Sequence, residues 1–160
     1  MSQIEKHLKW CLNDENRLKR VKPNKDIAEK HLKKSEYNAQ VLRDLEKLKR
    51  YDWALNVGFY AVYHCFLAIL FYYGYKSKNQ SCSITAILNL INEKKIDMDK
   101  NLVLQFDTLE VDKDAISTTI RQSRELSTYG VSSSIDTKKL EEIKELIKKI
   151  QQATIQILNS

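Results

Sequence analysis

The stretch Trp53–Tyr75, WALNVGFYAVYHCFLAILFYYGY, contains no Asp, Glu, Lys or Arg, and it constrains the fold more than any other part of the chain. A membrane-spanning helix needs about 20 apolar residues, so length alone would allow a span. Yet Asn56, Tyr60 and His64 lie within it, and polar side chains inside a bilayer need partners. A helix that is apolar all round is also typical of the centre of a helical bundle. We therefore expect the central helix of a soluble bundle with no membrane partner, and a membrane span is the alternative.

The scarcity of turn-forming residues excludes most all-β architectures. The 160 residues include 3 Gly and 1 Pro, whereas average usage is about 7% and 5%. A β-sandwich or barrel needs a turn roughly every 8–12 residues, which this composition does not supply. With 42% hydrophobic and 30% charged residues, the chain is not disordered. The composition thus predicts a compact all-α protein of one domain.

Apolar residues at helical spacing predict the remaining elements. Residues 3–20 form a weakly amphipathic helix, and Pro23 separates it from the rest of the chain. We therefore divide the chain into an N-terminal accessory helix, 1–22, and a helical bundle, 24–160, in an up-and-down arrangement of four to five helices. The helices expected in that bundle cover about 26–50 (capped by Asn24), 53–73, 83–92 (capped by Ser83), a segment capped by Asp97 or Asp99, 112–129, and 137–158 (capped by Asp136). The last has a heptad-like apolar seam, which fits packing on its own bundle or, alternatively, pairing with a partner helix.

The charge balance and the cysteines bear on partners and on compartment. The net charge of +6 suits polyanionic partners, but the charge is spread as helix-face lysines, which favours an ordinary solvated surface over a nucleic-acid footprint. Cys11, Cys65 and Cys82 are scattered and have no metal-ligand spacing. We expect reduced thiols, no metal and no cofactor. No apolar core of signal-peptide type follows the first residues, so we expect a cytoplasmic protein.

Only three histidines could supply imidazole chemistry. His7 and His31 lie on charged helical stretches, where we expect them to be solvated. His64 lies inside the uncharged helix, where burial costs free energy unless a ring nitrogen is hydrogen-bonded. Its side chain is either a satisfied core histidine or part of a site.

A second candidate is the segment TIRQSRELSTYG. Arg121 and Arg124 are i, i+3 neighbours, so their guanidinium groups lie near one face of a helix. Such a pair can hold a phosphate and oppose the charge that develops on it. Tyr129 adds an aromatic face and a hydroxyl. The alternative is a surface helix on which Glu110 and Glu125 neutralise the arginines.

These residues resemble the HEPN-domain family. The matching parts are a helix of the A-x-x-x-L-x-x-A type, a y-x-x-A start to the next helix, an aYYAmfHaa-like core, a G-x-x-x-k-s loop and a later arginine element. In this chain they are Ala28–Leu48, Tyr51–Ala54, Phe59–His64, Gly74–Lys78 and Arg121–Gly130. The resemblance covers about residues 26–158.

The resemblance implies a bundle of four to five helices that usually forms a two-fold dimer. Many HEPN proteins are metal-independent ribonucleases, and many are toxins paired with a small nucleotidyltransferase antitoxin. In active members an arginine and a histidine of each subunit meet at the dimer cleft, where the histidine transfers protons and the arginine stabilises the phosphorane. In some toxins the motif extends to R-x4-H-x-Y, and the antitoxin adenylylates the tyrosine.

Carried onto this chain, the resemblance aligns Arg121 with the arginine and Tyr129 with the tyrosine, but Ser127 occupies the histidine position. A serine hydroxyl does not titrate near neutral pH, so it cannot replace imidazole as general acid or base. Either the chain is not a nuclease, or another imidazole serves; the one plausible substitute is His64, which would make Arg121 and His64 the catalytic pair. Phosphate binding is assigned to Arg121, Arg124, Ser127 and Tyr129.

Three hypotheses emerge, and the sequence leaves open whether the chain is an enzyme. The first is a catalytically degenerate HEPN-like homodimer that binds RNA or a nucleotide phosphate at an arginine-rich cleft and pairs with a nucleotidyltransferase. The second is an active ribonuclease toxin. The third is a non-catalytic helical interaction module.

Overall fold

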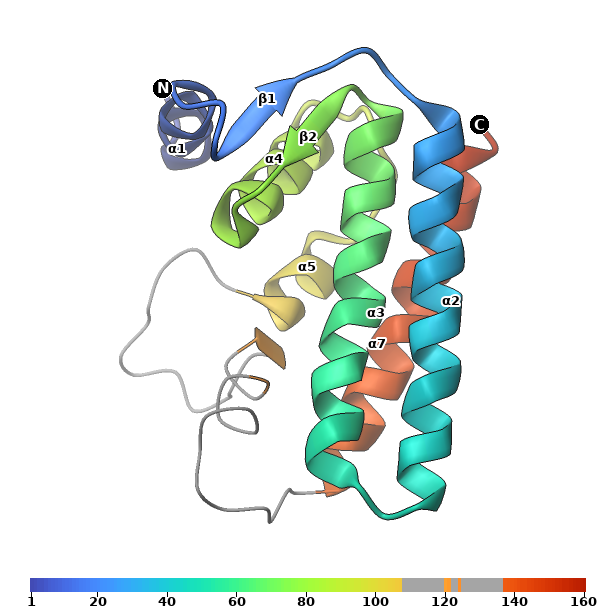
Figure 1. Ribbon diagram of the computed structural model, residues 1–160. Helices are drawn as coiled ribbons and strands as arrows, with labels where there is room; N and C mark the ends of the chain where they lie inside the picture. The colour runs from blue at the N-terminus through green and yellow to red at the C-terminus, as the bar shows by residue number, and fades with distance from the viewer. Residues whose placement is uncertain (108–119, 122–123, 125–136) are drawn as a thin grey trace.

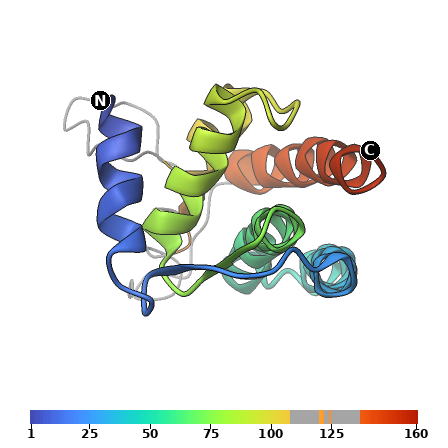
Figure 2. The same cartoon turned by 90° about the horizontal axis from the view of Figure 1, so that it is seen from above.

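The computed structural model describes residues 1–107, 120–121, 124 and 137–160, and these form an all-α bundle with one small two-stranded sheet (Figure 1). Three long helices lie side by side: α2 (Lys25–Lys47), α3 (Tyr51–Tyr72) and α7 (Thr137–Leu158). The helix α7 runs at a tilt across the other two, as the view from above shows (Figure 2). The expectation of a helical bundle with an extra N-terminal helix is confirmed.

The helices α2 and α3 form an antiparallel hairpin. Asn24 caps α2, its side chain accepting a hydrogen bond from the Ile27 N–H at 3.0 Å, and Asp26 in the first turn suits the helix dipole. The pair has the most extensive contact in the fold, because both helices are long and face each other along their length.

The uncharged helix α3 is the core of the bundle. Phe59 and Phe66 are fully buried, and both rings pack on Phe106 with centroids 4.9 and 5.1 Å apart. By length and composition α3 could cross a membrane, but 67% of its most apolar window is buried inside the protein. Gly58 lies where α3 approaches α7: a Cβ there would lie 2.7 Å from the Ile143 Cδ1.

The helix α7 packs its apolar seam on its own bundle, which was the first of the two predictions for that seam. Along the seam the buried residues are Leu140, Ile143, Leu146, Ile147, Ile150, Thr154, Ile157 and Leu158. Lys144 also forms an ion pair with Glu46 of α2 at 2.9 Å. The predicted cap, Asp136, lies outside the described residues.

Two shorter helices come after α3 in the chain. The helix α4 (Gln80–Asn92) begins three residues earlier than expected, because Asn79 and not Ser83 is the cap; its side chain accepts from the Cys82 N–H at 2.9 Å. The helix α5 (Lys100–Phe106) is capped by Asp99, one of the two predicted residues. It ends at Phe106, because the next residue, Asp107, has an extended backbone.

The N-terminal segment, residues 1–20, is not helical throughout. The helix α1 (Gln3–Leu12) ends early, and the strand β1 (Leu18–Arg20) pairs antiparallel with β2 (Tyr75–Ser77), in the register that sets Leu18 opposite Ser77. Val21 and Gly74 close the joint, where the Val21 N–H donates to the Gly74 carbonyl at 2.8 Å. The prediction of a helix over 3–20 is therefore wrong beyond Leu12.

The cysteines differ from the expectation of three separate thiols. Cys11 and Cys82 form a disulfide that joins α1 to the first turn of α4. Cys65 is free and fully buried, so it is a small core residue. Burial raises the pKa of the Cys65 thiol to about 11, although hydrogen bonds from Ser35 and Thr154 act in the opposite direction. Cys65 therefore stays a protonated thiol at neutral pH and is not a nucleophile.

Candidate functional site

The two arginines of the predicted site lie at the same side of α3, on a segment that is helical at residues 120–121 and 124. Ile120 anchors this segment, since its side chain is fully buried. Arg121 forms an ion pair with Asp107, and its Nη1 donates to Oδ2 at 2.8 Å. The Asp107 side chain is 8% exposed and that of Arg121 is 31% exposed. The buried carboxylate therefore holds the guanidinium at the protein surface next to the end of α5.

Arg124 is buried against aromatic rings. Its Cζ lies 4.6 Å from the centroid of the Phe59 ring and 5.9 Å from that of Tyr60, and the whole residue is 8% exposed. A guanidinium within about 6 Å of a ring centroid is attracted by the ring quadrupole. Of the two arginines, Arg121 is accordingly the more accessible.

A chain of hydroxyl groups lies beside Arg121. The Tyr63 hydroxyl is 2.9 Å from the Ser83 Oγ, and that atom is 2.6 Å from the Ser77 Oγ. Burial raises the pKa of Tyr63, and the hydrogen bond with Ser83 and the positive charge of Arg121 oppose this only in part. The Tyr63 hydroxyl is therefore protonated at neutral pH and donates to the Ser83 Oγ, which in turn donates to the Ser77 Oγ.

His64 lies on the side of α3 that faces α2. Its Nδ1 is 2.9 Å from the Nδ1 of His31, and the two rings stack at 5.2 Å, so one ring donates to the other. Burial, followed by the charges of His31 and Lys34, lowers the pKa of His64 to about 4. A general base works best with a pKa near the operating pH, so this neutral, paired imidazole is a poor proton acceptor at pH 7. The structure favours the interpretation of a satisfied core histidine.

The other histidines are less exposed than expected. His31 is half-buried, its pKa is lowered by burial, and its ring also stacks on Phe71 at 5.4 Å. His7 is half-buried between α1 and α4 and contacts the Ser81 Oγ at 3.1 Å. The expectation that both rings are solvated holds only in part, because each ring is half-buried and has a partner that is distant in the sequence.

The remaining residues of the predicted site, Ser127 and Tyr129, lie outside the described residues. The structure thus brings together Arg121 and Arg124 and places His64 with α2. Sequence reasoning missed Asp107, Phe59 and Tyr63 as parts of the site. One signal was present: Asp107 directly follows the apolar Phe106, so its carboxylate was a candidate for burial, and buried charges are paired.

Among the described residues, the group of His, Cys, Asp or Glu side chains with metal-ligand geometry is His7, Cys11 and Cys82. It lies between α1 and α4, whereas the arginines contact α3 and the end of α5. No metal chemistry is therefore assigned to the arginine site.

Comparison with known proteins agrees with this fold. The family model described as the HEPN domain matches residues 28–157. No curated protein matches the chain significantly. The match spans α3 with its buried aromatic core, both arginines of the site and nearly all of α7. The chain therefore belongs to the HEPN-domain family.

Proposed function

We propose that this protein binds RNA or a nucleotide phosphate at the surface around Arg121 and Tyr60, with the buried Arg124 packed against the Tyr60 ring. The observation that carries the proposal is the placement of two guanidinium groups beside Phe59, Tyr60 and the Tyr63 hydroxyl. Guanidinium groups bind phosphate oxygens strongly, and Tyr60, which is exposed next to Arg124, offers a ring face on which a base can stack. The net charge of +6 supports a polyanionic ligand.

We propose binding with little or no catalysis. Ser127 stands where active relatives have the histidine, and a hydroxyl does not exchange protons near pH 7. His64 is paired with His31 and has a pKa of about 4. Losing a proton-transfer group typically lowers a rate by about 10²–10⁴. An active ribonuclease toxin is the competing function.

The proposed binding site adjoins a dimer contact along α3. Partly exposed residues recur along α3 as a stripe at heptad-like spacing and continue past the site: Trp53, Val57, Tyr60, His64, Leu67 and Phe71. Two of them, His64 and Phe71, also contact His31 of α2. Trp53 is 57% exposed and Tyr60 is 38% exposed. A contiguous exposed apolar patch is typical of an interface, and Tyr60 in this stripe also contacts Arg124. A second copy of the chain docked on this stripe would place two arginine sites in one cleft.

The binding test compares Arg121→Ala with Arg43→Ala. Arg43 is exposed on α2 and contacts Gln40, so its removal makes the same change in charge elsewhere. Fluorescence anisotropy with a labelled single-stranded RNA should show about tenfold weaker binding for Arg121→Ala. The slope of log affinity against log salt should fall by about 1. Equal effects of the two variants would refute the site.

An RNA cleavage assay on the same purified protein distinguishes binding from cleavage. The purified protein is incubated with transfer RNA and total RNA in EDTA, and the products are separated by size. The proposal expects intact RNA at concentrations that saturate binding. Cleavage that disappears in Arg121→Ala would establish the ribonuclease instead.

The dimer test uses Tyr60→Glu, with Tyr37→Glu as the matched control. Tyr37 is 61% exposed on α2. A charge buried in the proposed contact should give a monomer by sedimentation velocity, whereas the control stays dimeric. If both variants behave as the parent does, α3 is not the dimer contact.

We also propose, from family membership, a cytoplasmic location and a nucleotidyltransferase partner. The test is co-expression with the product of an adjacent nucleotidyltransferase gene, followed by purification and intact mass measurement. Co-purification supports the pairing, and an added adenylyl group at Tyr129 would show that the partner modifies this chain. A partner bound without any RNA binding by either protein would favour the interaction-module hypothesis.

A further inference from the structure

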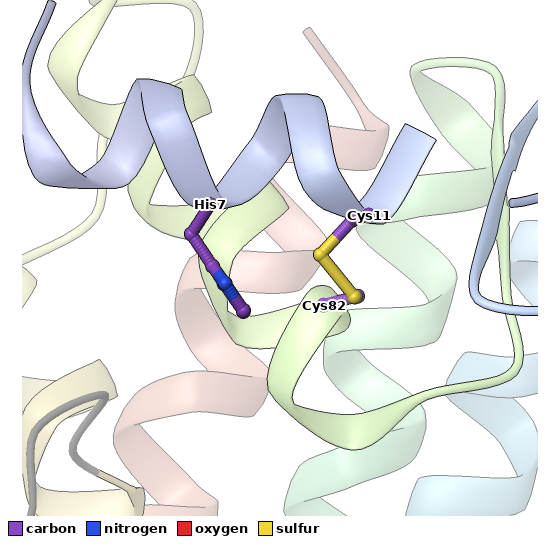
Figure 3. Close-up of side chains that lie close together, drawn as sticks. All are labelled: His7, Cys11 and Cys82. Carbon is purple, nitrogen blue, oxygen red and sulfur yellow. A yellow bond between two sulfur atoms is a disulfide. The ribbon is translucent and has the colours of Figure 1, made fainter. Parts of the chain in front are cut away.

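Three side chains with metal-binding chemistry meet between α1 and α4. His7 and Cys11 are four residues apart on α1, so they project from the same side of the helix toward the first turn of α4 (Figure 3). Cys82 lies in that first turn. The ligand atoms of the three side chains lie within 4.8 Å of one another. Residues 71 positions apart in the sequence therefore form a single cluster.

The histidine of this cluster is held in place. Its ring stacks on Trp10 at 5.3 Å with the planes 13° apart, and its Nε2 is 3.1 Å from the Ser81 Oγ. Cys11 and Cys82 are fully buried. His7 lines an open pocket together with Gln3, Lys6, Trp10 and Ser81. The cluster thus has a solvent-accessible side at His7 and a buried side at the two sulfurs.

The disulfide and a metal would use the same two sulfur atoms. A dithiol reductant supplies two electrons and two protons: the S–S bond breaks, each sulfur takes one proton, and the reductant becomes a disulfide. Two thiols and one imidazole then form a Cys2His donor set, which Zn²⁺ binds as two thiolates and a neutral imidazole with release of two protons.

The distances fit this donor set. Zinc binds sulfur at about 2.3 Å and nitrogen at about 2.0–2.1 Å, so tetrahedral ligand atoms are about 3.5–3.8 Å apart. The three ligand atoms already lie within 4.8 Å, and side-chain rotation can supply the remaining adjustment. The positive end of the α4 dipole favours a thiolate at Cys82.

We propose that reduction of the Cys11–Cys82 disulfide creates a site for Zn²⁺ formed by His7, Cys11 and Cys82, with its fourth position open to the pocket. The disulfide and the metal are then two alternative ties between the N-terminal segment and α4. The site is independent of the arginine surface and does not rest on RNA binding.

Cobalt is the probe, because Co²⁺ occupies zinc sites and its bonds to thiolate absorb light. The full chain is reduced with a phosphine, freed of reductant without oxygen, and titrated with Co²⁺. We expect one Co²⁺ per chain, a thiolate-to-cobalt charge-transfer band, and loss of that band when Zn²⁺ is added. The oxidised chain should show no band. A reduced chain without the band refutes the site.

Variants identify the ligands. Cys11→Ser and Cys82→Ser should each abolish the band, and Cys65→Ala, which alters the third thiol, should keep it. His7→Phe preserves a ring that can stack on Trp10 and should weaken Co²⁺ binding at least tenfold. Unchanged affinity in His7→Phe, or loss of the band in Cys65→Ala, would overturn the assignment.

A second readout does not depend on cobalt. Stoichiometric Zn²⁺ should slow alkylation of Cys11 and Cys82 in the reduced chain at least tenfold, as followed by peptide mass, and His7→Phe should lose that protection. Mg²⁺, which prefers oxygen ligands, should give none. Equal alkylation rates with and without Zn²⁺ would contradict the proposal even if the chain is folded.

Discussion

The three-helix bundle and the N-terminal segment are held in different ways. The bundle of α2, α3 and α7 shares its stability among many buried apolar side chains, such as Leu42, Phe59, Phe66, Ile143 and Ile150. The N-terminal segment buries few residues. Its position depends on three separate connections to the rest of the chain: one disulfide, a short strand pair and the hydrogen bond from Val21 to Gly74. Damage to the bundle should therefore be felt throughout the protein, whereas damage to one connection should be felt locally.

The strongest effect is expected in the bundle. Phe66→Ala removes a fully buried ring that packs edge-on against Phe106 at 5.1 Å. We expect the free energy of unfolding to fall by about 3–5 kcal/mol, because the cavity adds to the lost burial. Chemical denaturation followed by circular dichroism measures it, and Tyr37→Ala, at an exposed position, is the control. A loss below about 1 kcal/mol would remove the contrast between the two regions.

The next effect concerns the disulfide. Cys11→Ser should cost about 2–4 kcal/mol, since the bond closes a long loop. Hydrogen exchange should show the greatest loss of protection in α1 and β1 and the least in the middle of α3. The parent chain under reducing conditions is the matched reference. Equal losses in α1 and α3 would mean that the two regions are one cooperative unit.

A third prediction addresses the joint between the regions. Gly74 has φ +86°, and a Cβ there would lie 2.6 Å from the Val21 carbonyl oxygen, which is backbone and cannot swing away. Gly74→Ala should therefore cost about 1–3 kcal/mol. Thermal unfolding measures the loss, and hydrogen exchange at the Val21 amide, which donates to Gly74, should increase. An unchanged melting temperature would show that the backbone can relax here.

The weakest expected effect is the pH dependence of stability that comes from the His31–His64 pair. The pKa of His64 is about 4 in the folded chain and near 6.5 when unfolded, and that of His31 is also lowered. Below pH 6.5 the unfolded chain binds protons that the folded chain does not, so stability falls as pH drops from about 6.5 to 4. Because His64 is half-buried, solvent screening keeps the loss small.

The measurement compares denaturation of the parent and of His64→Gln at pH 7 and pH 5. Carboxylates titrate in both proteins, so the difference between the two slopes isolates the histidine. A steeper slope in the variant than in the parent would contradict the assigned direction.

The sequence was most informative where the structure depends on local patterns. The uncharged stretch predicted the core helix, and apolar spacing predicted α2 and α7, since burial of one face decides such helices. The strands β1 and β2 were not predicted, because three-residue strands exist only through their pairing with each other. The Cys11–Cys82 bond was hidden for the same reason: its partners are 71 residues apart.

The candidate site was predictable only in part. The spacing of Arg121 and Arg124 indicated one face, and the structure places both beside α3. Their partners, Asp107 and Phe59, come from other elements, and only the packing of α3 against α5 brings them near. The His31–His64 pair likewise joins two helices whose separate sequences gave no sign of it.

The pairing of β1 with β2 has a practical consequence. The family match covers residues 28–157 and so includes β2 but not β1 or Cys11. A chain shortened to the matched residues would leave the β2 backbone amides and carbonyls unpaired along an open edge, and Cys82 with an unbonded sulfur. Open edges recruit strands from other molecules, so such a truncation should self-associate for reasons unrelated to the native oligomer.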